Sequence, residues 1–233
     1  ISTQMKISSY ILLSSLLALL PLTAAAQEEV KNDTVSGRFL DFRGLSVSTD
    51  LFGYAYSLLE DYTSGEVAIE INLGNKYYPI VEVGYGSTDF TDETFGIYYK
   101  SAAPYYKIGL NYNFSNKIGE KPRHSYIYGL ARFAWTRADY DVSAPPITDP
   151  VWGGSVGLDL NDVNGYYSWI ELGVGVKVKI LKNFHMGWSI RYKARANQVT
   201  GSNSRMWYIP GFGNSRHTTF GGTYSLIYEI PFK

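Results

Sequence analysis

The chain has 233 residues, of which 16% are aromatic, with 23 glycines, 21 tyrosines and no cysteine. Its formal net charge of +0 argues against a nucleic-acid partner, because proteins of that kind carry a basic surface. Without cysteine there is no disulfide, no thiol-based metal or redox site and no lipid on an N-terminal cysteine, and we expect no cofactor.

The N-terminal region has the three parts of a secretory signal peptide. A short basic region at Lys6 precedes an apolar run over residues 10–22, and small residues end at Ala26. The apolar run is short for a membrane-spanning helix, which makes a retained anchor the weaker alternative. We predict a signal peptide over residues 1–26, cleaved after Ala26, with residues 1–4 upstream of the natural start.

Most of the remaining chain alternates apolar and polar residues with period two, which predicts β-strands. Residues 27–43 lack this pattern and are expected to form a periplasmic tail ahead of a barrel over 44–233. The eight predicted strands are 44–51, 67–73, 81–86, 106–114, 125–136, 169–180, 184–195 and 219–232. The predicted long loops are 53–65, 87–104, 137–167 and 197–216, and the short connections are 74–76, 115–124 and 181–183. A further strand within 152–160 would raise the count towards ten.

Long and short connections alternate along the chain, and the strand number is even. Both features are typical of outer-membrane barrels, in which closure also pairs every backbone group. We therefore expect an all-β, antiparallel up-and-down transmembrane β-barrel of eight strands in the outer membrane of a Gram-negative bacterium. The alternative is a soluble, lipocalin-like barrel, which would turn the same apolar face inward. Aromatic residues near strand ends are expected to form interfacial girdles: Tyr77, Tyr78, Tyr105, Tyr106, Tyr126, Trp135, Tyr166, Tyr167, Trp169 and Phe184.

The hairpin of residues 169–195 allows its register to be predicted. Opposed residues in a hairpin point to the same face, and the apolar residues of both arms are even-numbered, so a three-residue loop is required. That loop is 181–183, with Asn183 expected in the left-handed conformation. The register places these pairs opposite one another: Ile180 and Phe184, Glu171 and Lys193, Gly173 and Arg191, and Lys177 and Gly187.

Several stretches resemble a known family. They are Trp152–Ser155, Lys182–Phe184, Met186–Ser189, Trp207–Gly213 and Phe220–Tyr224. With them, the chain is similar to an uncharacterised family of small outer-membrane β-barrel proteins from Bacteroidetes. The resemblance implies the barrel and its location. It implies no activity, and no functional residue is carried over.

The polar face of the predicted strands carries charges, and a barrel would bury them in its interior. Unpaired buried charges are costly, so we predict a structural network of ion pairs and hydrogen bonds, with acidic strands facing basic ones. An anion-selective lumen is the functional alternative, although eight strands leave an interior mostly filled by side chains. The predicted network is Asp50, Glu70, Glu82, Lys107, Arg132, Glu171, Lys177, Lys179, Arg191, Lys193, Arg195 and Glu229.

The last long loop is apolar for an exposed segment. We predict that it folds over the barrel mouth as a lid, or else binds a partner, through Trp207, Tyr208, Ile209, Pro210 and Phe212. The aromatic Phe232, one residue from the C-terminus, resembles the signal that barrel-assembly machinery reads. The predicted partners are outer-membrane lipid, this machinery and a larger outer-membrane complex.

Three functions follow as hypotheses. The first is a non-catalytic barrel with a structural or interaction role through its outer loops. The second is a narrow porin or solute channel. The third is a lipid-modifying enzyme at the outer rim, where His217 has Ser215, Thr218 and Thr219 nearby. For the aspartates of 137–167, calcium binding is a weaker hypothesis than a solvated loop, because no EF-hand-like spacing is present.

Overall fold

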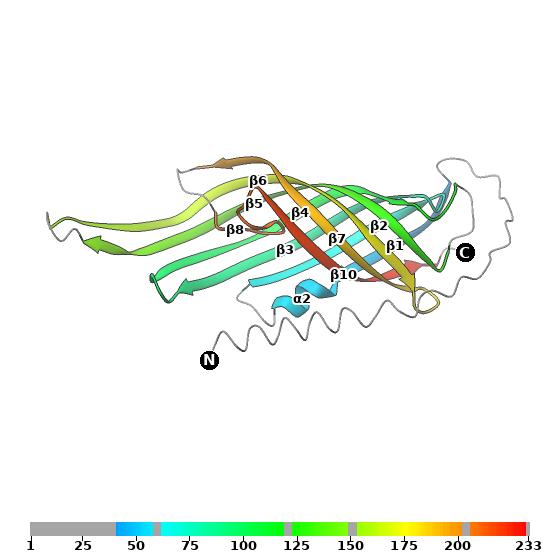
Figure 1. Cartoon of the computed structure of the whole chain (residues 1–233), viewed down its shortest axis with the longest axis horizontal. Coiled ribbons are helices and arrows are strands. Elements are labelled where there is room, and N and C mark those ends of the chain that lie inside the picture. Colours follow the sequence, from blue (N-terminus) through cyan, green and yellow to red (C-terminus); the bar gives the residue numbers. More distant parts are fainter. Residues whose placement is uncertain (1–40, 58–61, 119–122, 149–152, 202–205, 232–233) are drawn as a thin grey trace. The chain divides into compact units, whose positions relative to one another are not determined.

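The computed structural model describes residues 41–57, 62–118, 123–148, 153–201 and 206–231. Within the compact unit 34–233, eight antiparallel strands close into a barrel in the order β1-β10-β7-β6-β5-β4-β3-β2 (Figure 1). The predicted all-β barrel of eight strands is confirmed. The elements are β1 (Phe42–Asp50), α2 (Leu51–Ser57), β2 (Tyr62–Leu73), β3 (Tyr77–Asp92), β4 (Ile97–Asn113), β5 (Ser125–Thr148), β6 (Ser155–Lys179), β7 (Phe184–Thr200), β8 (Tyr208–Ile209), β9 (Gly213–Asn214) and β10 (Thr218–Ile230).

The β6–β7 hairpin has the predicted register. Glu171 lies opposite Lys193, and the amide of Ile180 donates to the carbonyl of Phe184 over 2.9 Å. The predicted left-handed conformation of Asn183 is wrong, because its φ is not positive. The left-handed asparagine is instead Asn75, with φ 58°, in the β2–β3 turn. Asparagine does tolerate the left-handed conformation, but different turns place that conformation at different residues.

The segment 87–104, predicted as a loop, is mostly strand. β3 runs to Asp92 and β4 begins at Ile97, with paired residues along the whole hairpin. Burial still alternates in this part of β4, because Tyr99 and Ala103 point inward and are buried, whereas Lys100 and Ala102 are exposed. The apolar side chains lie here on the inward face instead of the outward face, so a strand predicted from one continuous apolar face ends too early.

The same correction applies to 137–167, because β5 and β6 extend as a long hairpin through it. The separate strand predicted at 152–160 is, from Ser155 on, part of β6, while 149–152 lie outside the described residues. The pairing shifts register between Ala144 and Ile147, around two prolines. Proline has no N–H for the ladder, so a register irregularity is where a strand tolerates it.

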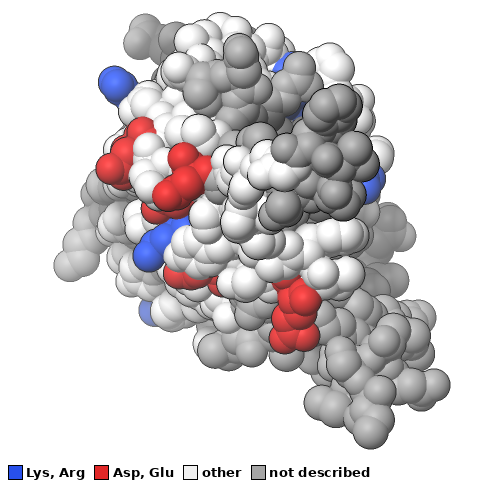
Figure 2. Space-filling view, turned by 90° about the vertical axis from the view of Figure 1, so that its left-hand side faces the viewer, with Lys and Arg blue, Asp and Glu red and all other residues white. Residues whose placement is uncertain are grey.

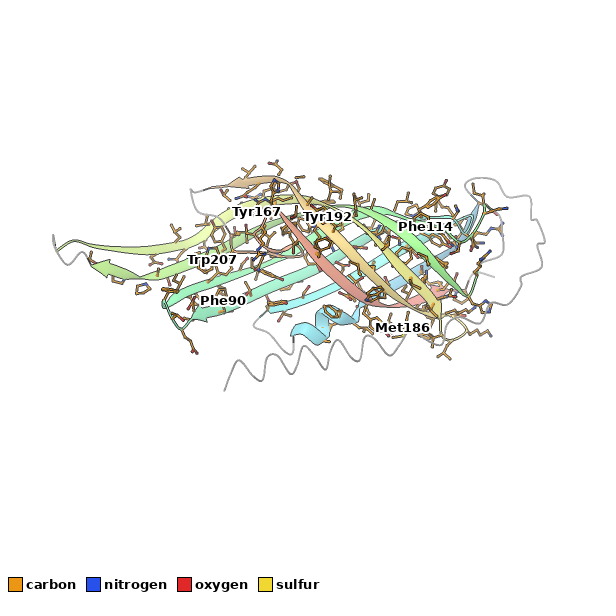
Figure 3. All side chains as sticks on the ribbon, viewed as in Figure 1. Phe90, Phe114, Tyr167, Met186, Tyr192 and Trp207 are labelled. Atoms are coloured by element: carbon orange, nitrogen blue, oxygen red, sulfur yellow. The ribbon has the colours of Figure 1, made fainter. Side chains whose placement is uncertain are left out.

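The two faces of the barrel wall have opposite chemistry. The outward face carries aliphatic side chains such as Val67, Ile108 and Val174, which are about half-exposed. The inward face carries buried charged and amide side chains such as Glu82, Lys107 and Asn111. Figure 3 shows side chains on both sides of the ribbon along these strands. This is the reverse of the arrangement expected for a lipocalin-like barrel.

The predicted aromatic girdles are only half right. Tyr106, Tyr166 and Phe184 are exposed on the outward face, but Tyr105 and Tyr167 point into the barrel and are buried. Consecutive residues of a strand point to opposite faces, so two adjacent tyrosines cannot both meet lipid. The other buried members of the predicted girdles are Tyr78, Tyr126 and Trp169.

The strand β1 is short at its outer end. It begins at Phe42, two residues ahead of the predicted start, and stops at Asp50, where the helix α2 of about two turns follows. Residues 53–57, predicted as loop, belong to this helix. In the described part of the chain, no helix is long and apolar enough to cross a membrane. The predicted signal peptide, most of the predicted tail and Phe232 lie outside the described residues.

Candidate functional site

The centre of the barrel is a cluster of ion pairs around Lys107 of β4. Its Nζ atom lies 2.6 Å from Glu66 Oε2, 3.3 Å from Glu171 Oε1 and 3.7 Å from Glu82 Oε2. These carboxylates come from β2, β6 and β3, so one ammonium group joins opposite parts of the wall. All four side chains are almost fully buried.

Two guanidinium groups complete this central cluster. Arg132 on β5 donates from Nε to Glu82 Oε1 over 2.9 Å and from Nη2 to Asn111 Oδ1 over 2.7 Å. Arg191 on β7 donates from Nη1 to Glu82 over 3.1 Å and to Glu171 over 3.2 Å. Arg191 Nη1 also lies 3.7 Å from Glu66 Oε1. Each of the three carboxylates of the central cluster therefore has at least two cationic partners, which offsets the free energy lost when charges leave water.

A second ion pair lies on the side of the short turns. Lys177 Nζ is 2.9 Å from Glu70 Oε1, and Asn111 Nδ2 donates to Glu70 Oε2 over 2.6 Å. Around it, Tyr78 and Tyr126 stack with ring centroids 5.7 Å apart. Among the described residues, the cavity between the central cluster and the Lys177–Glu70 pair measures only about 40 Å³. Side chains therefore fill most of this part of the lumen.

The remaining members of the predicted network lie at its edges. The Asp50 carboxylate accepts the backbone N–H groups of Tyr224 and Phe52. Arg195 donates to Ser215 Oγ over 3.3 Å, and Glu229 faces His185 at 3.8 Å. Lys179 is exposed at the end of β6, so the structure places it outside the buried network.

Glu66 is the central residue that the sequence reasoning missed. The predicted strand 67–73 begins five residues after the true start of β2 at Tyr62, because Gly65 was expected to end a loop. Glu66 has the same parity as Ala68 and Glu70, so extending the alternation by one step would have placed it inside. Trp169 was also missed as a partner, because it was assigned to a girdle. Its Nε1 atom donates to Glu171 Oε1 over 2.8 Å.

The segment Met206–Asn214, which we call the lid, folds into the outer mouth of the barrel. Met206, Ile209 and Phe212 are buried, and the Phe212 ring packs edge-on against Trp169 with centroids 5.7 Å apart. Trp207 stays partly exposed and lies near Phe90 of β3 (Figure 3). The lid hypothesis accounts for these contacts, since most of the apolar side chains are covered.

Polar contacts hold the lid from several strands. The Tyr99 hydroxyl donates to the Tyr208 carbonyl over 3.1 Å, and Lys193 Nζ donates to the Gly211 carbonyl over 2.7 Å. Gly211 has φ +79°, and an added Cβ would collide with the ring of Tyr105. Burial raises the pKa of the Tyr208 hydroxyl to about 12, so this phenol is neutral at physiological pH.

A cavity of about 930 Å³ lies between the lid, the outer parts of β2, β3, β7 and β10, and helix α2. The central cluster forms the inner end of this cavity, because Lys107 and Arg191 are among the residues that line it. Many of its other side chains are aromatic. They are Phe52, Tyr62, Phe90, Tyr105, Trp207, Tyr208, Phe212 and Phe220.

The other predicted sites are not assembled. Within the described residues, no hydrogen bond joins the His217 side chain to a hydroxyl or a carboxylate, as a lipid-hydrolase site would need. The aspartates of the β5–β6 hairpin bind local groups: Asp141 accepts the N–H of Asp162, and Asp139 accepts from Asn164. No cluster of three or more metal-ligating side chains occurs in the described ranges. Figure 2 shows acidic side chains gathered on the face with the long hairpins.

Comparison with solved structures finds outer-membrane proteins at low identity. A major outer membrane protein from Thermus thermophilus has a TM-score of 0.49 and 11% identity, covering 80% of this chain and 98% of that chain. Neisserial surface protein A has a TM-score of 0.44 and 12% identity, covering 82% and 99%. Ail of Yersinia pestis, solved with the heparin analogue sucrose octasulfate, has a TM-score of 0.40 and 12% identity, covering 81% and 99%.

No curated protein matches the sequence. The sequence model of one family matches residues 5–233, almost the whole chain, and that family is described as a domain of unknown function. The chain belongs to this family, DUF6048.

Proposed function

We propose that this protein is an integral outer-membrane β-barrel that neither conducts solutes nor catalyses a reaction, and that acts through its outer hairpins. The observation that carries the proposal is the distribution of polarity across the wall. Val174 on the outward face is 55% exposed, whereas its neighbours Glu171 and Lys177 on the inward face are buried. A wall with an exposed aliphatic face is unfavourable in water and favourable in a lipid bilayer.

The outward belt also has the composition that a bilayer requires. Strand β6 presents Ile170, Leu172 and Val174 as exposed aliphatic side chains, and β4 presents Ile108 and Leu110. Exposed aromatic residues flank these aliphatic residues, with Tyr166 on β6 beyond Ile170 and Phe184 at the start of β7. This half of the predicted girdles supports a position across the membrane.

The filled lumen favours the non-conducting hypothesis over the narrow porin. The central cluster spans the barrel from β2 and β3 to β6 and β7, and the lid covers the outer mouth. A hydrated ion crossing here would have to separate buried ion pairs, which costs several kcal/mol for each charge that loses its partner. The lipid-modifying enzyme lacks a comparable supporting observation.

The lipid of the outer membrane and the barrel-assembly machinery are the partners that this proposal requires. A larger outer-membrane complex is the partner that would explain the long outer hairpins. Co-purification in mild detergent tests it directly, because a stable complex would retain its other subunits through gel filtration.

Three measurements test the proposed function. We expect the protein in outer-membrane fractions, a change of gel mobility when the folded sample is heated, and no stable unitary current in planar bilayers. Recovery of the folded protein in the aqueous periplasmic fraction would overturn the membrane position. Reproducible unitary currents from heat-modifiable protein would overturn only the non-conducting part and restore the narrow channel.

A further inference from the structure

In the part of the chain that the structure describes, the barrel wall has a gap at its outer end. Strand β1 pairs with β10 only as far as Asp50 opposite Ser225, and with β2 only as far as Thr49 opposite Val67. Both neighbours continue outward, β10 back to Thr218 and β2 back to Tyr62. Among the described residues, no strand pairs with these two facing edges, and α2 is the element that packs against both.

The outer cavity extends to this gap. Along β10 it is lined by Thr219, Gly221 and Thr223 from the inward set, and by Phe220 and Gly222 from the outward set. These five residues are consecutive and lie where β10 has no partner on the side of β1, so the cavity runs along the unpaired backbone edge of β10.

The edge of β10 is lined mostly by small side chains. Threonines and two glycines leave space beside α2, and Phe220 alone projects outward, 74% exposed. Its ring lies 5.2 Å from that of Tyr192 on β7, so the two rings form an aromatic surface beside the opening. An apolar ligand leaving the bilayer would meet this surface first.

Inside, the charges available to a ligand are positive. Four cations and two carboxylates line the cavity. Lys107 and Arg191 are held by carboxylates, as described above. Of the other two, Lys193 has a carboxylate only at 3.9 Å, and in the described part of the chain Arg216 has no ion-pair partner. Asp50 is occupied by two backbone N–H groups, and Glu66 by Lys107.

We propose that this cavity binds an amphipathic molecule with one alkyl chain and an anionic head group, which enters sideways from the outer leaflet through the gap between β10 and β2. The alkyl chain packs among the aromatic side chains of the lid and α2, and the head group is held by Lys193 and Arg216. The volume of about 930 Å³ lies within the usual range of about 300–1,000 Å³ for small-molecule sites. Sideways entry rests on the proposed membrane position.

The experiment uses the full-length mature protein in lipid nanodiscs, with hexadecanoate as the probe and native mass spectrometry as the readout. We expect one bound hexadecanoate per chain. Hexadecanol, which has the same chain and no charge, should bind at least about tenfold more weakly, because the cations then gain no partner. No saturable hexadecanoate binding, or equal binding of both probes, would overturn the assignment.

Two variants test the place of binding. Thr219→Trp fills the cavity from β10, and should weaken hexadecanoate binding at least about tenfold, since the same space cannot hold both groups. Tyr106→Trp, on the outward face of β4 and outside the cavity lining, is the control and should bind as the wild type does. Unchanged binding by Thr219→Trp would place the ligand elsewhere and overturn the proposal.

The head group is tested by Arg216→Met, with Lys182→Met at the distant β6–β7 turn as the control. Arg216→Met should reduce the preference for hexadecanoate over hexadecanol, and Lys182→Met should not. Equal effects of the two variants would overturn the assigned head-group site. Heat-modifiable mobility is measured for every variant, so a folded barrel without binding contradicts this inference alone, whereas a water-soluble protein contradicts the proposed function.

Discussion

Lys107 Nζ lies 2.6 Å from Glu66 Oε2, although the two residues stand on strands that are not neighbours in the barrel. The contact passes over the intervening strand β3, whose Glu82 the same ammonium group meets at 3.7 Å. The inner end of the outer cavity is thus part of the cluster that holds the wall together. A change in these side chains therefore affects both the stability of the barrel and any ligand binding in the cavity.

Removing the ammonium group should destabilise the barrel strongly. In Lys107→Met, three buried carboxylates lose a partner, and we expect a loss of about 3–5 kcal/mol in unfolding free energy. Lys100→Met is the matched control, because its ion pair with Asp89 is exposed and should contribute about 0–1 kcal/mol. Urea unfolding in lipid vesicles measures both. Similar losses would mean that the central cluster is not held as described.

The outward face can be tested with a single charge. Val174→Arg places a cation near the middle of the exposed aliphatic belt, where a bilayer should impose about 2–4 kcal/mol. Leu181→Arg, at the exposed β6–β7 turn, should cost about 0–1 kcal/mol. Both variants are unfolded in the same vesicles. A neutral effect of Val174→Arg would argue that water, not lipid, surrounds this face.

The two asparagine turns should respond differently to alanine. Asn75 has φ 58°, its backbone N–H donates to Asn72 Oδ1 over 2.9 Å, and its backbone carbonyl accepts from Asn113 Nδ2 over 3.1 Å. Asn75→Ala should cost about 1–2 kcal/mol through backbone strain, and Asn75→Gly should cost less.

The control for this turn is Asn183→Ala, because Asn183 has no positive φ. We expect a change within about 0.5 kcal/mol. The measurement is again unfolding in vesicles. A larger loss at Asn183 than at Asn75 would contradict the assigned turn conformations.

The lid should open locally when its buried ring is removed. Phe212→Ala loses the packing against Trp169, and truncation of a buried phenylalanine typically costs about 3–5 kcal/mol. Hydrogen exchange should then accelerate across 206–214 while the strands stay protected. Trp207→Ala, at a side chain 44% exposed, should accelerate exchange less. Equal protection of the lid in Phe212→Ala and wild type would show that Phe212 does not hold it.

The sequence by itself determined the local geometry of the wall. Period two placed Glu171 and Val174 on opposite faces, and parity determined the loop length between β6 and β7. These results need only neighbouring strands, because side-chain direction and hairpin register are local properties. The same rule, applied one residue earlier, would also have placed Glu66 inside and separated Tyr105 from Tyr106.

Only the tertiary structure decided what lies across the lumen. Which carboxylate meets Lys107 depends on how eight tilted strands close, and that closure relates residues far apart in the chain. The full length of β5 was also missed, because its outer apolar residues, Ala138, Tyr140 and Val142, lie on the inward face, whereas Ile127 and Phe133 of the same strand are apolar on the outward face. Finally, β1 stops at Asp50 while β10 and β2 continue, so the opening in the wall exists only once the ring is closed.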